Sequence, residues 1–177
     1  MVECINSELF AMMKCRELRH LYDCLVEGVR LADVSDAGTL ASFFARQPED
    51  SYKWFRPHGF DEVALRKLLS RKSYIIYVME EGGVIIGYAF LRCFVNGKCF
   101  LGKMVDVRHQ GKGVCTVLCA VGMRMANRLG MRMFESINKE NVGSMRASQK
   151  ACDVVVVEEL ENGDMLIEDR LREESLG

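Results

Sequence analysis

The sequence predicts a mixed α/β (α+β) domain in which a central, mostly antiparallel sheet of about seven strands is flanked by helices. Two observations carry this prediction. Short β-branched and aromatic runs recur along the 177 residues, and glycine-containing turns separate them. One such run, 98–107, passes through a glycine-containing turn into a helical pattern and then another strand. This strand–helix–strand unit has antiparallel hairpins on both sides, which makes the sheet mixed.

The composition is that of an ordinary soluble globular protein, with 49% apolar and 28% charged residues. A formal net charge of -1 gives no reason to expect nucleic acid or an anionic membrane as a partner. No apolar run approaches the roughly 20 residues that span a bilayer, and the charged residues near the N-terminus do not suit a signal peptide. The eight cysteines are scattered along the sequence, and no two of them form a C-x-x-C motif. We therefore expect reduced thiols in a cytoplasmic protein that binds no metal.

The first part of the chain is predicted to be mainly helical. Residues 7–23 follow helical spacing and belong to an N-terminal extension, 1–23, ahead of a single domain at 24–177. A β-like run at 24–31 comes next. Helices are then expected at 37–46, after the capping residues 33–36, and from Asp61 to about residue 71. The irregular segment 47–60 between them holds both prolines and the only tryptophan. Its aromatic side chains either line a binding site or cover a core edge.

The second part predicts a meander, a helix and a closing hairpin. Strands are expected at 74–79, 84–94 and 98–107, with turns at 81–83 and at Asn96-Gly97. A helix from 114 to 129 follows, with an apolar stripe on one face and Gly130 as its stop signal. A strand at 131–137, a helix at 141–151 and strands at 154–160 and 164–171 complete the chain.

The turn Gln110-Gly111-Lys112-Gly113 is the strongest candidate for a ligand site. Its glycines let the backbone turn tightly and approach a ligand without a Cβ in the way. The helix that follows leaves its first amides without acceptors, and its dipole makes that end partly positive. Such a turn is suited to phosphate. Neither a Walker motif nor G-x-G-x-x-G is present, so the motif is Q-x-x-G-x-C.

This motif resembles the pyrophosphate loop of the GNAT superfamily, the acetyl-CoA-dependent N-acetyltransferases, which reads Gln/Arg-x-x-Gly-x-Gly/Ala. Gln110 and Gly113 match, Leu118 matches the leucine that follows, and Cys115 departs from the small residue usual there. The element order is similar to the GNAT fold over nearly all of 28–170. The stretch 137–144 resembles the second cofactor motif of the family, with an Asn after the fifth strand. Asn141 is equally a helix N-cap.

The resemblance implies acetyl-CoA as cosubstrate, and no step of acetyl transfer requires a metal. Backbone groups from Val105 to Val107 are expected to bind the pantetheine arm, and the amides of the turn to bind the pyrophosphate. Lys112 either adds a charge contact or points to solvent. The expected cofactor-binding residues are Val105, Val107, Gln110, Gly111, Lys112, Gly113, Val114, Cys115, Asn141 and Ser144.

For the general base, the sequence offers Glu135 first and His58 second. Glu135 lies in an apolar strand on the face of Met133 and Ile137, where desolvation would raise its pKa toward neutrality. The alternative is a register in which Glu135 faces solvent or pairs with Arg132. His58 lies in the aromatic loop and has an ordinary pKa near 6.5.

Other polar residues near these motifs are weaker candidates. His109 is expected to lie too far along the cofactor to reach the amine. Asp106 faces away from Val105 and Val107 in the strand. Ser148 stands where many members of the family carry a tyrosine as general acid. Because a serine is a poor acid, the leaving thiolate would take its proton from water or from another group.

The leading hypothesis is therefore an N-acetyltransferase that acts on a primary amine of a small molecule, such as an amino sugar or another metabolite, through a ternary complex. The aromatic loop and the closing hairpin would shape the acceptor pocket. The alternatives are a protein N-terminal or lysine acetyltransferase and a non-catalytic acyl-CoA-binding module. Many relatives form dimers through their late strands, so a homodimer is a further expectation.

Overall fold

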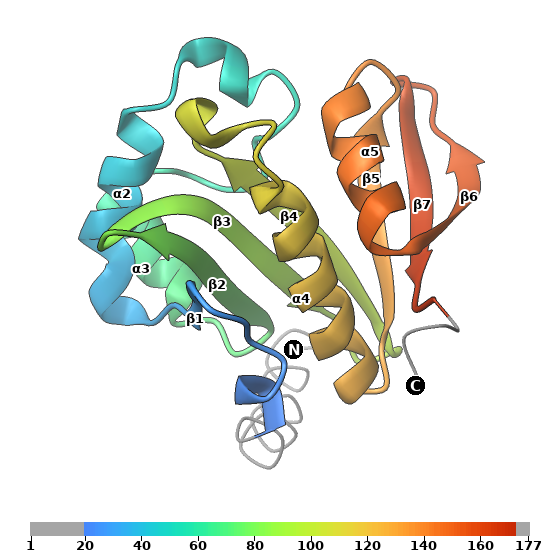
Figure 1. The fold of residues 1–177 in the computed structure, drawn as a ribbon, viewed down its shortest axis with the longest axis horizontal. Helices are drawn as coiled ribbons and strands as arrows, with labels where there is room; N and C mark the ends of the chain where they lie inside the picture. The colour runs from blue at the N-terminus through green and yellow to red at the C-terminus, as the bar shows by residue number, and fades with distance from the viewer. Residues whose placement is uncertain (1–19, 173–177) are drawn as a thin grey trace.

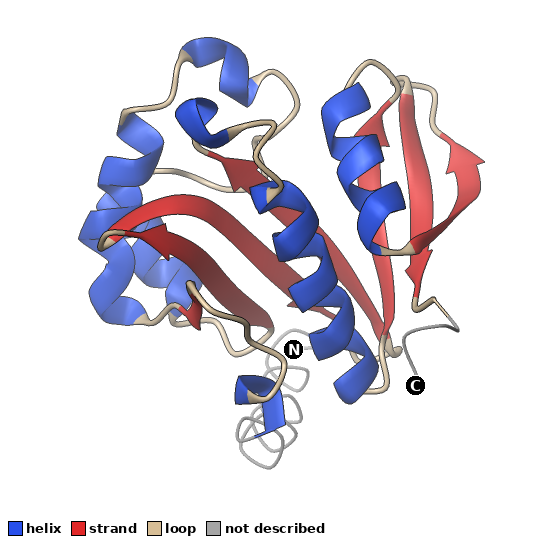
Figure 2. Ribbon diagram, viewed as in Figure 1, coloured by secondary structure: helices blue, strands red, loops and turns tan. Residues whose placement is uncertain are grey.

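The computed structural model describes residues 20–172, which form one sheet with helices on both of its faces (Figures 1 and 2). The strands are β1 (Val29–Leu31), β2 (Tyr74–Glu81), β3 (Val84–Cys93), β4 (Lys98–Val105), β5 (Arg132–Asn138), β6 (Asp153–Glu159) and β7 (Asp164–Arg170). The helices are α2 (Ala37–Ala45), α3 (Glu62–Leu69), α4 (Val114–Arg128) and α5 (Val142–Ala151). Short 3-10 turns span Val34–Asp36, Glu49–Tyr52 and Val107–His109.

The seven strands follow the order β1-β2-β3-β4-β5-β7-β6. Strands β4 and β5 pair in parallel, and each other neighbouring pair in this sheet is antiparallel. The crossover from β4 to β5 runs through α4, as a parallel connection requires. This arrangement confirms the predicted mixed, mostly antiparallel sheet with flanking helices.

Two apolar clusters, one on each face, hold the helices to the sheet. Side chains alternate along β2, so that Tyr77 packs toward α4 with Leu118 and Met125, whereas its neighbours face α2 and α3. The second cluster centres on Phe43 and Tyr88. Helix α5 lies on the same face as α4 and contributes buried residues to the first cluster. Among residues 20–172, no helix is both long and apolar enough to cross a membrane.

Glycines end several elements where the sequence placed turns. Gly82 and Gly83 have positive φ angles of 57° and 78° and form the turn between β2 and β3. Gly130, at a φ of 65°, follows the end of α4. Both turns use the left-handed region that glycine tolerates and most residues avoid.

The predicted strand at 24–31 is wrong in its first half. Only Val29–Leu31 pairs with β2, whereas residues 24–28 form turns closed by bonds such as Val29 N to Val26 O at 2.9 Å. Gly28 has a φ of 77° and interrupts the extended backbone. The apolar run did not predict this turn, because a glycine within such a run is also compatible with a strand.

The predicted helix at 7–23 lies almost entirely outside the described residues. Residues 20–22 are helical, and Leu21 is fully buried in the first apolar cluster. Six cysteines lie in the described part of the chain, and all are free thiols. Five of these are buried, and Cys115 is half-buried.

Candidate active site

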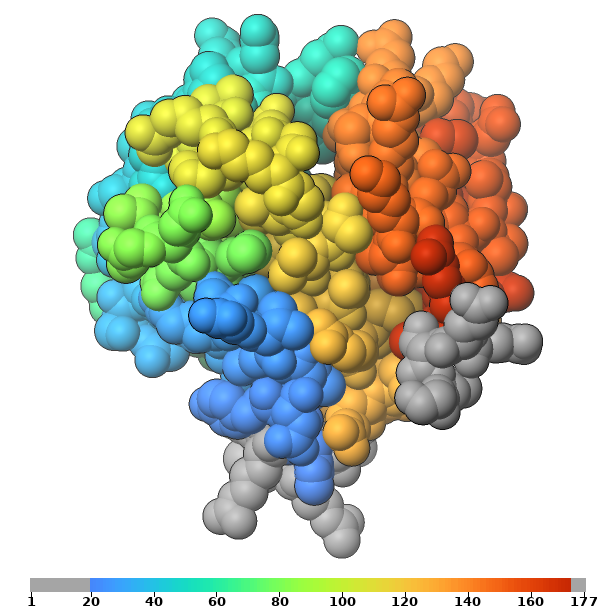
Figure 3. All heavy atoms as spheres, in the orientation of Figure 1, coloured from blue at the N-terminus to red at the C-terminus, as the bar shows by residue number. Residues whose placement is uncertain are grey.

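A cavity of about 680 Å³ opens where β4 and β5 separate. The two strands pair over three positions, Lys98–Phe100 with Arg132–Phe134, and the paired register stops there. Beyond Phe100 the edge of β4 that faces β5 lines open space instead of a strand. In the space-filling view the surface is hollowed between the yellow segment that precedes and begins α4 and the orange α5 (Figure 3).

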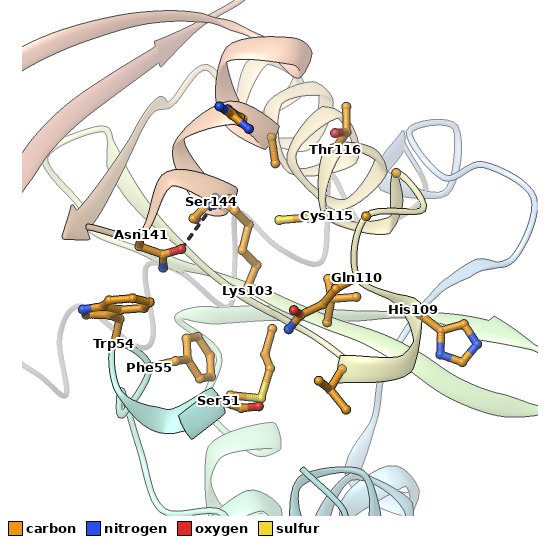
Figure 4. Close-up of a pocket in the computed structure, with 18 of the residues that line it drawn as sticks. Ser51, Trp54, Phe55, Lys103, His109, Gln110, Cys115, Thr116, Asn141 and Ser144 are labelled. Carbon is orange, nitrogen blue, oxygen red and sulfur yellow. Dashed lines mark hydrogen bonds between the residues drawn. The ribbon is translucent and has the colours of Figure 1, made fainter. Parts of the chain in front are cut away.

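Three parts of the chain form the wall of this cavity. The first is the segment from β4 to the start of α4, the second is the start of α5, and the third is the aromatic loop 48–55. The lining includes Asp50, Ser51, Trp54, Phe55, Lys103, Val105, Val107, His109, Gln110, Gly111, Gly113, Cys115, Asn141, Ser144, Arg146 and Lys150. Figure 4 shows how the aromatic loop, β4 and the two helix starts converge.

The turn before α4 presents unpaired backbone amides to the cavity. Gly111 and Gly113 have φ angles of 74° and 88°, and no atom lies within 4 Å of the position of an added Cβ at either residue. Gly113 is the N-cap of α4 and supplies no side-chain acceptor to the first turn. The first amides of this 15-residue helix therefore remain available, at the positive end of its dipole. This geometry is suited to bind phosphate.

A buried carboxylate anchors that turn to the rest of the domain. Asp106 is 1% exposed and accepts bonds from Arg46 Nε at 2.9 Å and from the Arg108 side chain and backbone. Gln47 adds a bond from Val107 N to its Oε1 at 3.1 Å. The bonds from Arg108, with those from Arg46, hold the pKa of Asp106 well below its usual range, although burial opposes them. Asp106 is thus a structural anion rather than a base.

The structure brings most of the predicted cofactor residues to this cavity. All of them line it except Lys112 and Val114. Lys112 is exposed. The Val114 side chain is buried and packs closely on Gly87 of β3, where its Cγ1 lies 2.8 Å from the position that a Cβ would take. Only the backbone of Val114 remains for a ligand.

The start of α5 forms the opposite wall. The Asn141 side chain accepts a hydrogen bond from Ser144 N at 3.2 Å, as the dashed line in Figure 4 shows. Asn141 is therefore an N-cap and a cavity residue at the same time. Arg146 and Lys150 lie further along α5 and are exposed at the rim.

Glu135 lies on the inward face of β5, as the period of the strand indicates, and is 3% exposed. It forms an ion pair with Lys103, and its Oε1 accepts a bond from Ser148 Oγ at 2.7 Å. The alternative pairing with Arg132 is not the one observed, because Arg132 binds Glu168 at 2.6 Å. Both carboxylate oxygens of Glu135 are engaged, and the residue lies behind the cavity wall rather than in it.

Lys103 was not among the residues expected from the sequence. Its side chain is 3% exposed and lines the cavity. Its Nζ donates to Glu135 and, at 3.1 Å, to Ser148 Oγ. Burial would lower the pKa of Lys103, but the negative charge of Glu135 beside it holds that pKa above its usual range. A lysine within an otherwise apolar strand was the available signal.

A second buried carboxyl group lies behind this pair. Asp169 of β7 is 2% exposed and opposes Met133 in the register, on the face that also carries Glu135. Burial, followed by the charge of Glu135, raises the pKa of Asp169 to about 8. Asp169 is therefore protonated at neutral pH, and the Lys103–Glu135 pair keeps its charges balanced.

His58 lies outside the large cavity. Its ring bonds the Tyr88 hydroxyl at 2.9 Å and the Gly59 carbonyl at 2.8 Å, and it packs against aromatic side chains of the second cluster. Burial lowers the pKa of His58, which lines a separate cavity of about 280 Å³. His109, in contrast, lines the large cavity, with its Nε2 at 3.2 Å from Glu81.

A protein-family comparison matches residues 40–153 to the model described as "Acetyltransferase (GNAT) family". No curated protein matches the chain. Three solved structures share its fold at low sequence identity, each with a TM-score above 0.6.

The protein yncA from Salmonella typhimurium, solved with acetyl-CoA, is 22% identical and has a TM-score of 0.64. That match covers 82% of this chain and 94% of the other. The ribosomal-protein-S5-alanine acetyltransferase from Vibrio fischeri is 20% identical, with a TM-score of 0.64 and coverage of 85% and 96%. The aminoglycoside acetyltransferase AAC(6')-Ib, solved with coenzyme A and kanamycin, is 16% identical, with a TM-score of 0.63 and coverage of 81% and 94%.

Proposed function

Because the chain belongs to the GNAT acetyltransferase family, we propose that it transfers an acetyl group from acetyl-CoA to a primary amine of a small molecule. The observation that carries this proposal is the cavity between the separated β4 and β5 strands. An anion-binding turn lies at one end of its wall, and an aromatic loop forms another part.

The residues present fit the cosubstrate. The amides around Gly111 and Gly113 would hold the pyrophosphate, since both glycines leave open space where a side chain would otherwise stand. The unpaired edge of β4 at Val105, together with Val107, would bind the amide groups of the pantetheine arm as an added strand. Cys115 is half-buried and lines the cavity beside these amides.

Acetyl-CoA supplies an acetyl group already activated as a thioester. The protein has to orient that group, exclude water and stabilise the negative charge that develops on the acyl oxygen. Backbone N–H groups of β4 beyond Phe100 are suited to this, because β5 does not pair with that stretch. Preorganised donors of this kind are worth about 3–4 kcal/mol of barrier in other enzymes.

The aromatic loop would form the acceptor side of the site. Trp54 and Phe55 supply apolar walls (Figure 4). Asp50 adds a carboxylate to the lining of the same cavity. An amine with a pKa near 10.4 arrives as a cation, and aromatic faces and a carboxylate both attract cations. A similar fold in AAC(6')-Ib binds kanamycin, which supports a small-molecule acceptor.

A protein N-terminus is the second candidate acceptor. The observation that favours it is the likeness to a ribosomal-protein-S5-alanine acetyltransferase, which shares the fold over 85% of this chain. A peptide needs an open groove that accommodates residues after the first, whereas a small amine needs only the pocket beside Trp54 and Phe55.

The experiment is a screen for acetylated product by mass spectrometry. Purified protein is incubated with acetyl-CoA and kanamycin, a linear polyamine, or a peptide that begins with alanine. Acetylation of a small amine, with KM raised in Asp50→Asn and unchanged in Glu161→Gln, supports the proposal; Glu161 is an exposed carboxylate away from the cavity. Acetylation of the peptide alone would instead establish a protein acceptor.

A further inference from the structure

We propose that Lys103 is a catalytic residue whose ammonium group holds the thiolate that leaves when the acetyl group is transferred. The inference rests on the proposed function, because it requires CoA in the cavity. It goes beyond that function by assigning the fate of the leaving group to a residue of β4.

The position of Lys103 matches that task. Traced backward from the phosphate-binding turn, the chain passes Val107 and then Val105 before it reaches Lys103 in β4. An extended arm that starts at the turn and runs along the unpaired edge therefore passes those valines before it reaches Lys103. Figure 4 shows the Lys103 side chain between Cys115 of α4 and Ser144 of α5.

The donors of Lys103 leave one N–H for a ligand. An ammonium group has three N–H donors and no acceptor. One is directed to Glu135 and a second to Ser148 Oγ at 3.1 Å. Because the side chain lines the cavity, the third is available to an anion there. Arg146 and Lys150 also line the cavity, but both are exposed and held less firmly.

Groups on every neighbouring element surround this ammonium. They are Glu135 of β5, Ser148 of α5, Cys152 just after α5, Cys115 and Cys119 of α4, Asp169 of β7 and Tyr77 of β2. Tyr77 donates to Leu118 O at 2.8 Å and has a pKa raised well above its usual value by burial. Among these groups, Glu135 is the direct ion-pair partner of Lys103.

The chemistry follows from this charge balance. Because the pKa of Lys103 is raised, the group stays an ammonium at neutral pH and acts by electrostatic attraction. The bond from the amine nitrogen to the acyl carbon forms, and the carbon–sulfur bond breaks with its electron pair going to sulfur. The cationic amine loses one proton to solvent before it attacks and a second once the new bond has formed, and Lys103 holds the thiolate. This arrangement dispenses with the acid that Ser148 cannot provide.

Glu135 and Ser148 are positioning residues in this scheme. Their oxygens fix Nζ from two sides, and Ser148 Oγ also donates to Glu135 Oε1 at 2.7 Å. An isolated buried lysine would lose its charge or leave the pocket, whereas the paired one remains charged and aimed.

The test compares binding of CoA with binding of desulfo-CoA, in which hydrogen replaces the thiol, and it needs no acceptor amine. Isothermal titration calorimetry is run from about pH 7 to 9.5, around the ordinary thiol pKa of about 8.5. If Lys103 holds the thiolate, binding lowers the thiol pKa. The affinity for CoA relative to desulfo-CoA then rises with pH, by about tenfold for each unit of pKa lowering.

Two variants separate Lys103 from its surroundings. Lys103→Met alone leaves the Glu135 charge buried without a partner, so the double variant Lys103→Met/Glu135→Gln is used with Glu135→Gln as its matched control. The double variant is expected to show the same pH dependence for both ligands. Glu135→Gln is expected to keep a smaller preference for CoA near pH 8, because Lys103 loses its buried partner in the free protein but can still pair with the bound thiolate.

An equal pH dependence for the two ligands in the unaltered protein would overturn the inference while leaving acetyl-CoA binding intact. A preference that persists in Lys103→Met/Glu135→Gln would overturn it too. Failure of the unaltered protein to bind either ligand would remove the proposed function itself.

Discussion

Replacing Asp169 by Asn should stabilise the protein at neutral pH. Asp169 is 2% exposed, and a side-chain hydrogen bond with Glu135 adds to the effects that favour its protonated form. Burial and the Glu135 charge raise its pKa to about 8, so the folded protein carries the protonated form at pH 7. Asn has the shape of that neutral acid and does not ionise.

The magnitude follows from proton linkage. In the unfolded chain an Asp has a pKa of about 3.9, so it is ionised at a pH where the folded protein still binds the proton. The contribution of Asp169 to stability is therefore greatest below about pH 4 and falls by about 1.4 kcal/mol per pH unit until the folded pKa is reached. At pH 7 the cost is on the order of 4 kcal/mol, and Asp169→Asn should remove most of it.

Urea unfolding at about pH 5, 6 and 7 measures this directly. The difference between Asp169→Asn and the unaltered protein should widen by about 1.4 kcal/mol for each pH unit. Asp153→Asn is the control, since Asp153 is 60% exposed and should change stability by less than about 0.5 kcal/mol. A constant difference across this range, or a loss of stability in Asp169→Asn at pH 7, would refute the protonated, buried acid.

Three further variants test the site and its supports. Gly113→Ala, at a φ of 88°, should cost about 1–2 kcal/mol by strain and weaken acetyl-CoA binding in calorimetry; unchanged affinity would contradict the role of the turn. Asp106→Asn should lower the free energy of unfolding, measured in urea, by about 2–3 kcal/mol at pH 7 and by less at pH 3. The lowered pKa of Asp106 stabilises the fold only above the unfolded-state pKa of about 3.9, so this contribution is lost in acid. Tyr77→Phe removes a buried bond to Leu118 O and should cost about 1 kcal/mol without changing affinity, whereas a loss of binding would assign Tyr77 to the site.

The elements that the sequence predicted well are those with strong local signals. The helix 114–129 combines an apolar stripe with a glycine at each end, and the structure has α4 at Val114–Arg128. Asp61 caps α3 by accepting a bond from Ala64 N at 2.9 Å, as its position before a helical pattern indicated. Local propensity and long-range packing agree at these places, so reading the pattern is enough.

The parts of the site that depend on distant pairing were not accessible in the same way. Glu135 could be placed on an inward face by its period of two, but its partner Lys103 lies 32 residues away in sequence. Their contact depends on how far β4 and β5 pair before they separate, and three residues of register decide that. His58 illustrates the reverse case, since its chemistry suggested a base and the fold gave it Tyr88 as a partner.

Thermal unfolding with and without acetyl-CoA, using ATP as a control, tests the central claim most directly. At about a hundredfold excess over the dissociation constant, linkage predicts roughly 2.7 kcal/mol of stabilisation. For a chain of this size that corresponds to a rise in Tm of roughly 5–10 °C. We expect this rise with acetyl-CoA and none with ATP, and an unchanged Tm at saturating acetyl-CoA would contradict an acetyl-CoA site in the cavity.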